Sequence, residues 1–389
     1  MSDPSVLFVD HAGVLGGAEL YLLDVARQFE GTSHVVLFEP GPFEDRLRAH
    51  DVSVEVCPAP AAFLNVQKSS GWASAASFLP GLVRLSVQLA RRARDYDLLY
   101  ANSQKAFFVA GLAGVLARRP VVWNLHDLLT ADHFSGLTRR TATFWANAFA
   151  DHVIVNSRAT HSAFVESGGR AEKTTVVYNG IDATPFAPSV LPPPQQTRDA
   201  FDLPAGPLVG IFSRLAPWKG QHVLLEALSQ LPDVHGLLVG DALFRGDESY
   251  KTTLHRRAER LGVADRIHFL GFRDNIAELM HAVDAVVHAS TEPEPFGRVI
   301  VEGMLARRPV IATRAGGAAE IIQHRQTGLL TSPGNADELS EAVDWLVSNP
   351  ERASQLAEAG RQHALDRFSL DTMMTQISDV IYEVTSSRA

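Results

Sequence analysis

The chain has 389 residues, of which 46% are hydrophobic and 20% are charged, and its formal net charge is −9 at pH 7. This length is about twice that of a typical single domain, so two domains are expected. The acidic balance, without a basic stripe that carries aromatic residues, argues against a nucleic-acid partner. The single cysteine, Cys57, excludes an internal disulfide framework and a cysteine-based metal site, which fits a reducing compartment.

Nothing in the sequence predicts secretion or a membrane span. The first residues, MSDPS, run directly into the strand-like VLFVD and lack the features of a signal peptide. The longest apolar candidate, residues 106–117, is too short to cross a bilayer and is interpreted as a buried helix. We therefore expect a cytoplasmic protein. Arginine-rich segments at 91–94, 118–119 and 139–140 are either solvated helix ends or a peripheral contact with the inner face of a membrane.

Apolar strands alternate with helices through the first half of the chain, which predicts a parallel sheet covered on both faces. The expected strands are 6–10, 34–38, 52–57, 98–101, 121–125, 152–156 and 175–178. The expected helices are 18–29, 43–49, 77–94, 105–116 and 159–167. This pattern is Rossmann-like.

The stretch 185–207 is rich in proline, cannot pair inside a sheet or continue a helix, and is interpreted as a linker. The alternation then restarts, with strands at 208–213, 236–239, 267–270, 285–288, 310–313 and 328–330. The expected helices are 222–231, 249–261, 276–281, 297–306, 318–323, 336–347, 351–368 and 370–385. We predict domains at 1–190 and 191–365 and a final helical segment at 366–389. Two doubly wound domains around one hinge leave a central cleft between the carboxyl ends of their sheets, where ligands of such folds bind.

The segment 289–303, ASTEPEPFGRVIVEG, carries the main functional signal. Pro293 and Pro295 prevent a helix from starting before about Phe296, so Glu294 lies on a loop and Glu302 lies in the helix.

The amides of Phe296, Gly297 and the residues that follow, Val299 among them, are then at a helix start after a parallel strand. Unpaired amides and the positive end of the helix dipole favour a phosphate there. The segment predicts a phosphorylated ligand, with one carboxylate for its hydroxyls and one near its reacting end. A polar loop before a buried helix is the alternative.

Two cations follow the first strand of the second half, in FSRLAPWKG. Arg214 and Lys219 lie five residues apart on a loop between a strand and a helix, where they can clamp a diphosphate. Two solvated surface cations are the alternative. The triplet Asp95-Tyr96-Asp97 resembles a divalent-metal motif, but it precedes its strand and so lies at the amino end of the sheet, away from the cleft. We therefore expect no metal site.

Taken together, these motifs resemble those of the family 4 retaining, nucleotide-sugar-dependent glycosyltransferases of group 1 type, which have the GT-B fold. The donor signature is carried by Glu294, Phe296 and Gly297, with Glu302 closing an E-x7-E spacing. The other matching segments are Gly16-Gly17-Ala18-Glu19, Asn179-Gly180-Ile181-Asp182, Phe212–Gly220, Leu270-Gly271-Phe272 and Gly316-Gly317 with Glu320. The chain departs from the family pattern at Ser213, Pro295, Gly303 and Arg308; glycine commonly occupies the position of Arg308.

The resemblance implies transfer of a sugar from a UDP- or GDP-sugar to an acceptor hydroxyl, without a cofactor or metal ion, and a final helix that crosses back onto the first domain. The catalytic residues it implies are Glu294, His126, Arg214 and Lys219. The donor-binding residues it implies are Gly16, Gly17, Arg214, Lys219, Phe272, Glu294, Phe296, Gly297, Val299 and Glu302. Glu294 would hold sugar hydroxyls, Glu302 the ribose, and His126 the transferred sugar.

The acceptor stays open between a glycan, a glycolipid and a small molecule, as in polysaccharide biosynthesis. Asn102, Ser103 and His11 lie at strand ends of the first domain that should face it. Two other functions are compatible with the architecture. A nucleotide-sugar epimerase would change its substrate without an acceptor, and a non-catalytic GT-B subunit would bind a partner enzyme.

Overall fold

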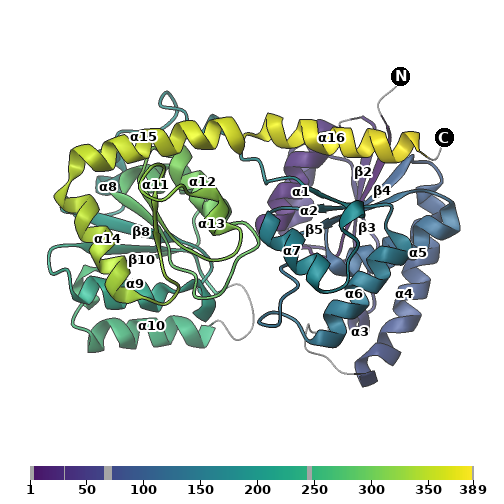
Figure 1. The fold of residues 1–389 in the computed structure, drawn as a ribbon, viewed down its shortest axis with the longest axis horizontal. Coiled ribbons are helices and arrows are strands. Elements are labelled where there is room, and N and C mark those ends of the chain that lie inside the picture. The colour runs from purple at the N-terminus through teal and green to yellow at the C-terminus, as the bar shows by residue number, and fades with distance from the viewer. Residues whose placement is uncertain (1–3, 30, 65–71, 243–247, 388–389) are drawn as a thin grey trace. The chain divides into compact units, whose positions relative to one another are not determined.

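The computed structural model describes residues 4–29, 31–64, 72–242 and 248–387. The first residues, on which the expectation of no signal peptide partly rests, lie outside this part. The chain divides into two compact units, Met1–Gly180 with Leu370–Ala389, and Ile181–Ser369 (Figure 1). These breaks, after residues 180 and 369, differ from the domain limits of 190 and 365 expected from the sequence.

The first unit is built on a seven-stranded parallel sheet in its described residues, with the strand order β3-β2-β1-β4-β5-β6-β7. The strands are β1 (Val6–Asp10), β2 (Ser33–Leu37), β3 (Val54–Val56), β4 (Leu98–Ala101), β5 (Val121–Leu125), β6 (His152–Val155) and β7 (Thr174–Val176). The order reverses between β1 and β4. At such a switch point the carboxyl ends of neighbouring strands diverge into loops that can hold a ligand.

Helices cover both faces of this sheet. They are α1 (Gly17–Gln28), α2 (Pro42–Ala49), α3 (Ala61–Leu64), α4 (Trp72–Ala93), α5 (Gln104–Ala117), α6 (Gly136–Phe149), α7 (Arg158–Glu166) and α16 (Leu370–Ser386), with a 3-10 turn at η1 (Ala171–Lys173). Side chains alternate along a strand, so Val6 and Phe8 join one core with α1, α2 and α16. Leu7 and Val9 join the other, with α4, α5 and α6. The apolar face of α16 therefore ties the C-terminal helix to the unit that begins the chain.

Helix α6 (Gly136–Phe149) was not expected from the sequence. Ser135 caps it by accepting a hydrogen bond from the amide of Thr138 (3.2 Å), and Ala142 and Ala146 are buried on its inner face. The ring of Trp145 lies 4.5 Å from that of Phe149. Trp145 and Phe149 therefore pack on each other, whereas Phe144 is 68% exposed. The membrane contact considered for the arginines of this segment stays a prediction.

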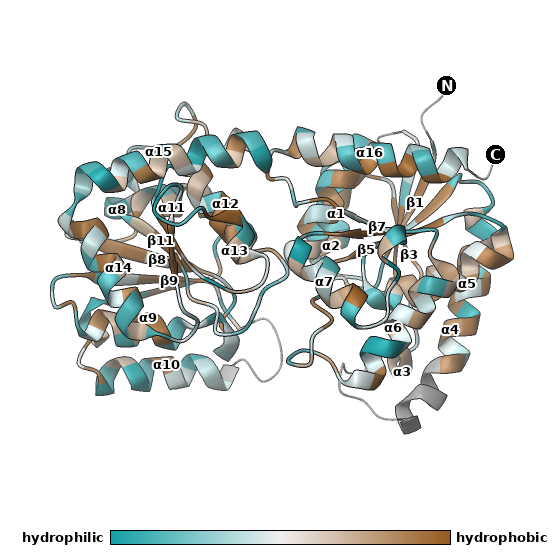
Figure 2. Cartoon of the chain, in the orientation of Figure 1, coloured by the Kyte–Doolittle hydropathy of each residue, from teal (hydrophilic) through white to brown (hydrophobic). Residues whose placement is uncertain are grey.

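The second unit contains a six-stranded parallel sheet in its described residues, ordered β10-β9-β8-β11-β12-β13. The strands are β8 (Leu208–Phe212), β9 (His235–Val239), β10 (Ile267–Gly271), β11 (Ala285–His288), β12 (Val310–Thr313) and β13 (Leu329–Thr331). The helices are α8 (Pro194–Ala200), α9 (Gln221–Ser229), α10 (Glu248–Arg260), α11 (Ile276–Ala282), α12 (Arg298–Leu305), α13 (Ala318–Ile321), α14 (Ala336–Ser348) and α15 (Pro350–Arg367). The 3-10 turns are η2 (Thr184–Phe186), η3 (Pro217–Lys219) and η4 (Ala264–Arg266). Figure 2 shows the apolar strands in brown between helices that carry hydrophilic residues.

The proline-rich stretch 185–207, which was interpreted as a linker, forms part of the second unit and contains a helix. Helix α8 (Pro194–Ala200) starts with proline in its first turn, where the missing amide would have no helical partner. Arg198 then fastens the helix: its Nε donates to Ala282 O at 2.7 Å and its Nη2 to Asp284 Oδ2 at 3.0 Å. This contact spans more than 80 residues of sequence, so local composition could not reveal it.

Candidate functional site

Glu294 is the best-defined polar residue of the second unit. It lies on the loop between β11 and α12, as expected, and only 7% of it is exposed. Its Oε1 accepts a hydrogen bond from Lys219 Nζ at 2.7 Å and another from the hydroxyl of Ser290, and His288 Nε2 lies 2.9 Å away. Among the described residues, the side-chain hydrogen bonds of Glu294 all fall on Oε1. The other oxygen is therefore available to a hydroxyl of a ligand.

The charges around Glu294 fix its protonation state. Burial would raise the pKa of this carboxyl, but the charges and hydrogen bonds of Lys219 and His288 hold the pKa well below its usual range. Glu294 is therefore ionised at neutral pH. An ionised, oriented carboxylate accepts hydrogen bonds from sugar hydroxyls, and its charge would stabilise positive charge that develops on a nearby sugar carbon.

A second loop holds the Glu294 segment in place. The amide of Gly317 donates to Glu294 O at 2.8 Å, and Gly316 forms an isolated parallel bridge with Glu294. Gly316 has φ of 57°, and a Cβ at this position would lie 2.2 Å from Glu294 O. Only glycine permits this close approach of two backbones. The Gly-Gly pair that resembles the family element therefore positions the loop that carries Glu294.

The two predicted cations lie over one aromatic ring. Lys219 Nζ lies 4.2 Å and Arg214 Cζ 5.4 Å from the ring centroid of Trp218, which stands on the 3-10 turn η3. Such contacts hold cations in place without neutralising their charge. Lys219 also pairs with Glu294, a contact that the predicted diphosphate clamp did not include. A bound anion would share Lys219 with this carboxylate.

A hollow of about 190 Å³ lies at the carboxyl ends of β8, β9 and β10. Arg214, Phe272 and Glu302, three of the residues predicted from the sequence, line it together with Ser213 and Asp241. Phe272 is 56% exposed and presents a ring on which a planar group could stack. Burial raises the pKa of Glu302, and Arg298, 3.6 Å away, partly offsets that effect. The structure thus brings a cation, an aromatic ring and a carboxylate to one edge of the sheet.

The remaining predicted donor residues stand at the start of α12 (Arg298–Leu305). Gly297 is its N-cap, with φ of 104°. Val299 is half-buried in the first turn. Phe296 is only 2% exposed, and its ring lies 5.8 Å from that of Phe368. Its side chain is therefore part of the core, and only its main chain could contact a ligand.

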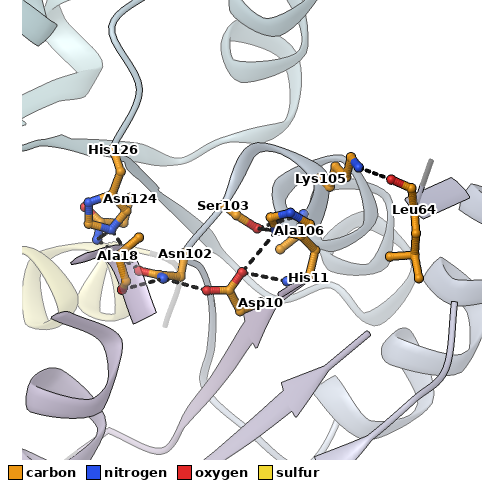
Figure 3. Close-up of polar contacts among 10 residues, drawn as sticks. All are labelled: Asp10, His11, Ala18, Leu64, Asn102, Ser103, Lys105, Ala106, Asn124 and His126. Carbon is orange, nitrogen blue, oxygen red and sulfur yellow. Dashed lines mark hydrogen bonds and ion pairs between the residues drawn. The ribbon is translucent and has the colours of Figure 1, made fainter. Parts of the chain in front are cut away.

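In the first unit, polar side chains gather at the ends of β1, β4 and β5 (Figure 3). We call Asp10, Asn102, Asn124 and His126 the strand-end cluster. Asn102 Nδ2 donates to Asp10 Oδ2 at 2.7 Å and to Ala18 O at 3.0 Å. His126 Nε2 lies 2.9 Å from Asn102 Oδ1 and 2.7 Å from Asn124 Nδ2. This ring nitrogen is thus held by two asparagines, which fixes the orientation of the imidazole.

His11 and Ser103, predicted to face the acceptor, adjoin the strand-end cluster. His11 Nδ1 lies 2.8 Å from Ser103 Oγ and 3.3 Å from Asp10 Oδ1. Asp10 is fully buried, and burial would raise its pKa. Hydrogen bonds from His11, Asn102 and Ser103, with the charge of His11, lower it below its usual value. The side chain of His11 is 31% exposed, so its imidazole can reach solvent or a ligand.

Gly16 and Gly17 begin helix α1 (Gly17–Gln28), with Gly16 as the N-cap in an extended conformation. Glu19, in the first turn, is nearly buried. Burial and the charge of Asp10 raise its pKa to about 7. The turn therefore carries a carboxyl group that is partly protonated near neutral pH.

Sequence reasoning missed His288, Ser290, Trp218 and Asp10. His288 and Ser290 stand at the end of β11, and Asp10 is the last residue of β1, so position at a strand's carboxyl end could have indicated all three. Trp218 lies between the two predicted cations in sequence, but nothing local reveals that both approach its ring.

Two further properties concern the whole described part of the chain. None of its helices is both long and apolar enough to cross a bilayer. Within residues 4–29, 31–64, 72–242 and 248–387, no three histidine, cysteine, aspartate or glutamate side chains gather as a metal site would require. The predicted metal independence of the chemistry stays a prediction.

Comparison with known proteins decides the family. Residues 16–180 match the glycosyl transferase 4-like domain, and residues 196–363 match the family of glycosyl transferases group 1. The Anabaena protein Alr3699/HepE, solved with UDP and glucose and with UDP-glucose, is 41% identical with a TM-score of 0.88. That match covers 97% of this chain and 99% of the Anabaena chain. The chain belongs to the group 1 glycosyltransferases.

Curated relatives support the same family over shorter stretches. The lipopolysaccharide core biosynthesis glycosyltransferase LpsE of Rhizobium meliloti is 32% identical over 49% of this chain and 53% of its own length. A GDP-mannose-dependent phosphatidylinositol monomannoside mannosyltransferase of Mycolicibacterium smegmatis is 32% identical over 62% and 65%. The matches thus span about half to two thirds of these relatives. For this group 1 glycosyltransferase, the predicted family and the GT-B type of α/β fold are confirmed.

Proposed function

We propose that this glycosyltransferase moves a sugar from a UDP-sugar, UDP-glucose first among the candidates, to an acceptor hydroxyl with retention of configuration. The observation that carries the proposal is the arrangement around Glu294. An ionised, buried carboxylate has one oxygen saturated by Lys219, His288 and Ser290, and its loop leads into α12, which bears Glu302. A buried charge needs such compensation to be stable. A buried, ionised carboxylate on a loop is therefore a candidate functional residue.

The donor would be bound by groups with separate tasks. The hollow lined by Phe272 and Glu302 fits a nucleoside, with the base beside the aromatic ring and the ribose hydroxyls on the carboxylate. Arg214 and Lys219 fit the diphosphate, because both cations lie over Trp218 near the same loop. Amides at the start of α12, from Gly297 to Val299, would add to the positive potential. The open oxygen of Glu294 would take sugar hydroxyls.

The proposed step breaks the bond between the anomeric carbon and the diphosphate oxygen and forms a bond from that carbon to the acceptor oxygen. The acceptor's proton passes to the leaving phosphate on the same face. Negative charge grows on the diphosphate as its bond breaks, and Arg214 and Lys219 would stabilise it. A metal ion would then not be required, and we expect full activity in EDTA. Gly16, Gly17 and His126 of the first unit remain predicted contributors to donor binding.

For the acceptor, we propose a hydroxyl of a glycan or a lipid-linked glycan. The support comes from two sides. The name of LpsE assigns it to lipopolysaccharide core biosynthesis, and the name of the Mycolicibacterium smegmatis enzyme includes a phosphatidylinositol monomannoside. In the first unit, His11 and Ser103 form a polar, partly exposed pair beside the buried strand-end cluster. The pair can exchange hydrogen bonds with a sugar hydroxyl.

The test combines donor binding with product analysis. UDP-glucose, UDP-galactose and GDP-mannose are titrated against the purified protein in a thermal-shift assay, and a UDP-sugar is expected to raise the unfolding temperature most. Glu294→Gln is expected to bind UDP but to lose transfer by at least 100-fold, whereas the matched variant Glu341→Gln, on the exposed face of α14, keeps it. Nuclear magnetic resonance of the product assigns the anomeric configuration. Near-normal transfer by Glu294→Gln, or an altered nucleotide sugar formed without acceptor, contradicts the proposal.

A further inference from the structure

The second unit contains a larger cavity that the proposed reaction does not use. It has a volume of about 620 Å³, within the range of small-molecule sites. We call it the arginine cavity, because Arg198, Arg307 and Arg308 line it. Its apolar lining includes Leu346, Val347 and Pro350. The cavity could therefore hold both an anionic group and an uncharged body.

Arg308 lacks a charge partner in this cavity. Its Nη2 donates to His281 O at the end of α11, but its buried Nε has no hydrogen-bond partner and it forms no ion pair within the described residues. Burial lowers the pKa of Arg308, which reflects the free-energy cost of the buried charge, and the charge of Arg198 lowers it further, while Asp284 partly compensates. Arg308 is partly buried, and removing a cation from water without a paired anion costs free energy. An anion in the cavity would remove that cost.

The other charges of the lining are already paired to different degrees. Arg198 is held by Asp284 at 3.0 Å and serves the fold. Arg307 faces Glu358 at 3.5 Å, but these side chains are 46% and 63% exposed, so the pair contributes little. Three arginines and two carboxylates line the cavity, which leaves one positive charge in excess. Arg198 and Arg307 each have a carboxylate partner, so among the described residues Arg308 is the arginine of this lining without an ion pair.

The position of the cavity separates it from the donor hollow. The cavity is lined by Val209, Ala285 and Pro309, which lie at or just before the amino ends of β8, β11 and β12. The donor hollow lies at the carboxyl ends of β8, β9 and β10. Helix α12 (Arg298–Leu305) joins the two regions, because it carries Glu302 and its C-cap, Ala306, is followed by Arg307 and Arg308. A ligand in the cavity would hold the end of the helix that bears a donor residue.

We propose that the arginine cavity binds a small phosphorylated metabolite, with its phosphate on Arg308 and Arg307 and its body against the apolar lining. Arginine suits this role because its planar fork donates two parallel hydrogen bonds to a phosphate. Binding at this edge of the sheet stabilises the second unit and adjusts donor affinity through α12. The site is distinct from the proposed catalytic site and does not depend on it.

The experiment measures the unfolding temperature with inorganic phosphate or glucose 1-phosphate, and with uncharged glucose as a neutral control. UDP is kept in excess so that the donor hollow is filled. The wild type is expected to show a saturable increase of several degrees with glucose 1-phosphate and a smaller one with phosphate, and none with glucose. Arg308→Gln and Arg307→Gln are each expected to reduce the apparent affinity at least tenfold. Arg352→Gln, an equal change of charge at an exposed position of α15 outside the lining, keeps the wild-type response.

Arg308 also caps α11, so its replacement could disturb the fold. Arg308→Gln therefore counts as a test of the cavity only if UDP still raises its unfolding temperature as it does in the wild type. Ser354→Trp, which fills the cavity from the exposed side of α15, provides a second test and is expected to abolish the response. An unchanged response in Arg307→Gln and Ser354→Trp, or no saturable response in the wild type, overturns the proposal. If UDP does not bind, the proposed donor is refuted. The cavity proposal is still tested in that case, because the response of the wild type can be compared with those of Arg307→Gln and Ser354→Trp without UDP.

Discussion

Replacement of Lys219 by methionine tests the electrostatic account of the Glu294 site. Lys219 Nζ lies 2.7 Å from Glu294 Oε1, and the two side chains are 16% and 8% exposed. Removing one partner of a buried pair leaves the other charge uncompensated, which costs about 3–5 kcal/mol. His288 and Ser290 still contact Glu294, so we expect the lower end, about 3 kcal/mol. For a unit of roughly 190 residues this corresponds to a decrease of about 6–12 °C in unfolding temperature.

The effect of Lys219→Met depends on pH in a defined direction. The native pKa of Glu294 is depressed, so the stabilisation from its charge is present above its unfolded pKa of about 4.3 and is lost as pH falls through the native value. The variant lacks this stabilisation. The difference in unfolding free energy between wild type and variant is therefore expected to be constant above about pH 6 and to shrink below about pH 4.

The assay is thermal and urea unfolding without ligand, because Lys219 is also proposed to bind the donor and activity alone would not separate the two roles. The control is Lys251→Met, which breaks the exposed pair with Asp241, 3.1 Å apart and 40% and 39% exposed, and should cost less than about 1 kcal/mol. In the double variant Lys219→Met with Glu294→Gln, the two costs should not add, because the uncompensated charge is gone. Equal costs for both lysine variants, or simple additivity in the double variant, refute the reasoning.

Three more predictions follow from the described contacts. Glu19→Gln is expected to raise the unfolding temperature more at pH 8 than at pH 5, because the native pKa of about 7 lies above the unfolded value and ionisation of Glu19 above pH 5 disfavours the folded state; an equal increase at both pH values contradicts this. Gly316→Ala is expected to destabilise the second unit by about 1–3 kcal/mol and to abolish transfer, since its Cβ would lie 2.2 Å from Glu294 O; wild-type unfolding and turnover would exclude that clash. Trp218→Leu is expected to weaken UDP-glucose binding about 3–30-fold through lost cation–π contacts, measured by calorimetry; unchanged affinity would show that the ring does not position the cations.

Much of the architecture could be predicted because it is encoded locally. Continuous apolar strands alternating with helices indicate parallel sheets, and prolines at 293 and 295 place Glu294 on a loop and Glu302 in a helix. Errors occurred where local signals were weak or misleading. Helix α6 (Gly136–Phe149) starts from a single serine cap, and α8 (Pro194–Ala200) lies in a stretch whose prolines resembled those of a linker.

The amino-acid sequence by itself determined the alternation of elements, the family, and which residues of the donor site follow which strand, because strand and helix periodicity and turn chemistry act over a few residues. Only the tertiary structure decided which distant groups compensate each other. Lys219 pairs with Glu294 and His288 contacts it, Gly316 approaches its backbone, and Arg198 binds Asp284. Arg308 is partly buried beside a cavity, and its Nε has no hydrogen-bond partner among the described residues. Electrostatic free energy depends on distance and burial in space, and a linear sequence contains neither.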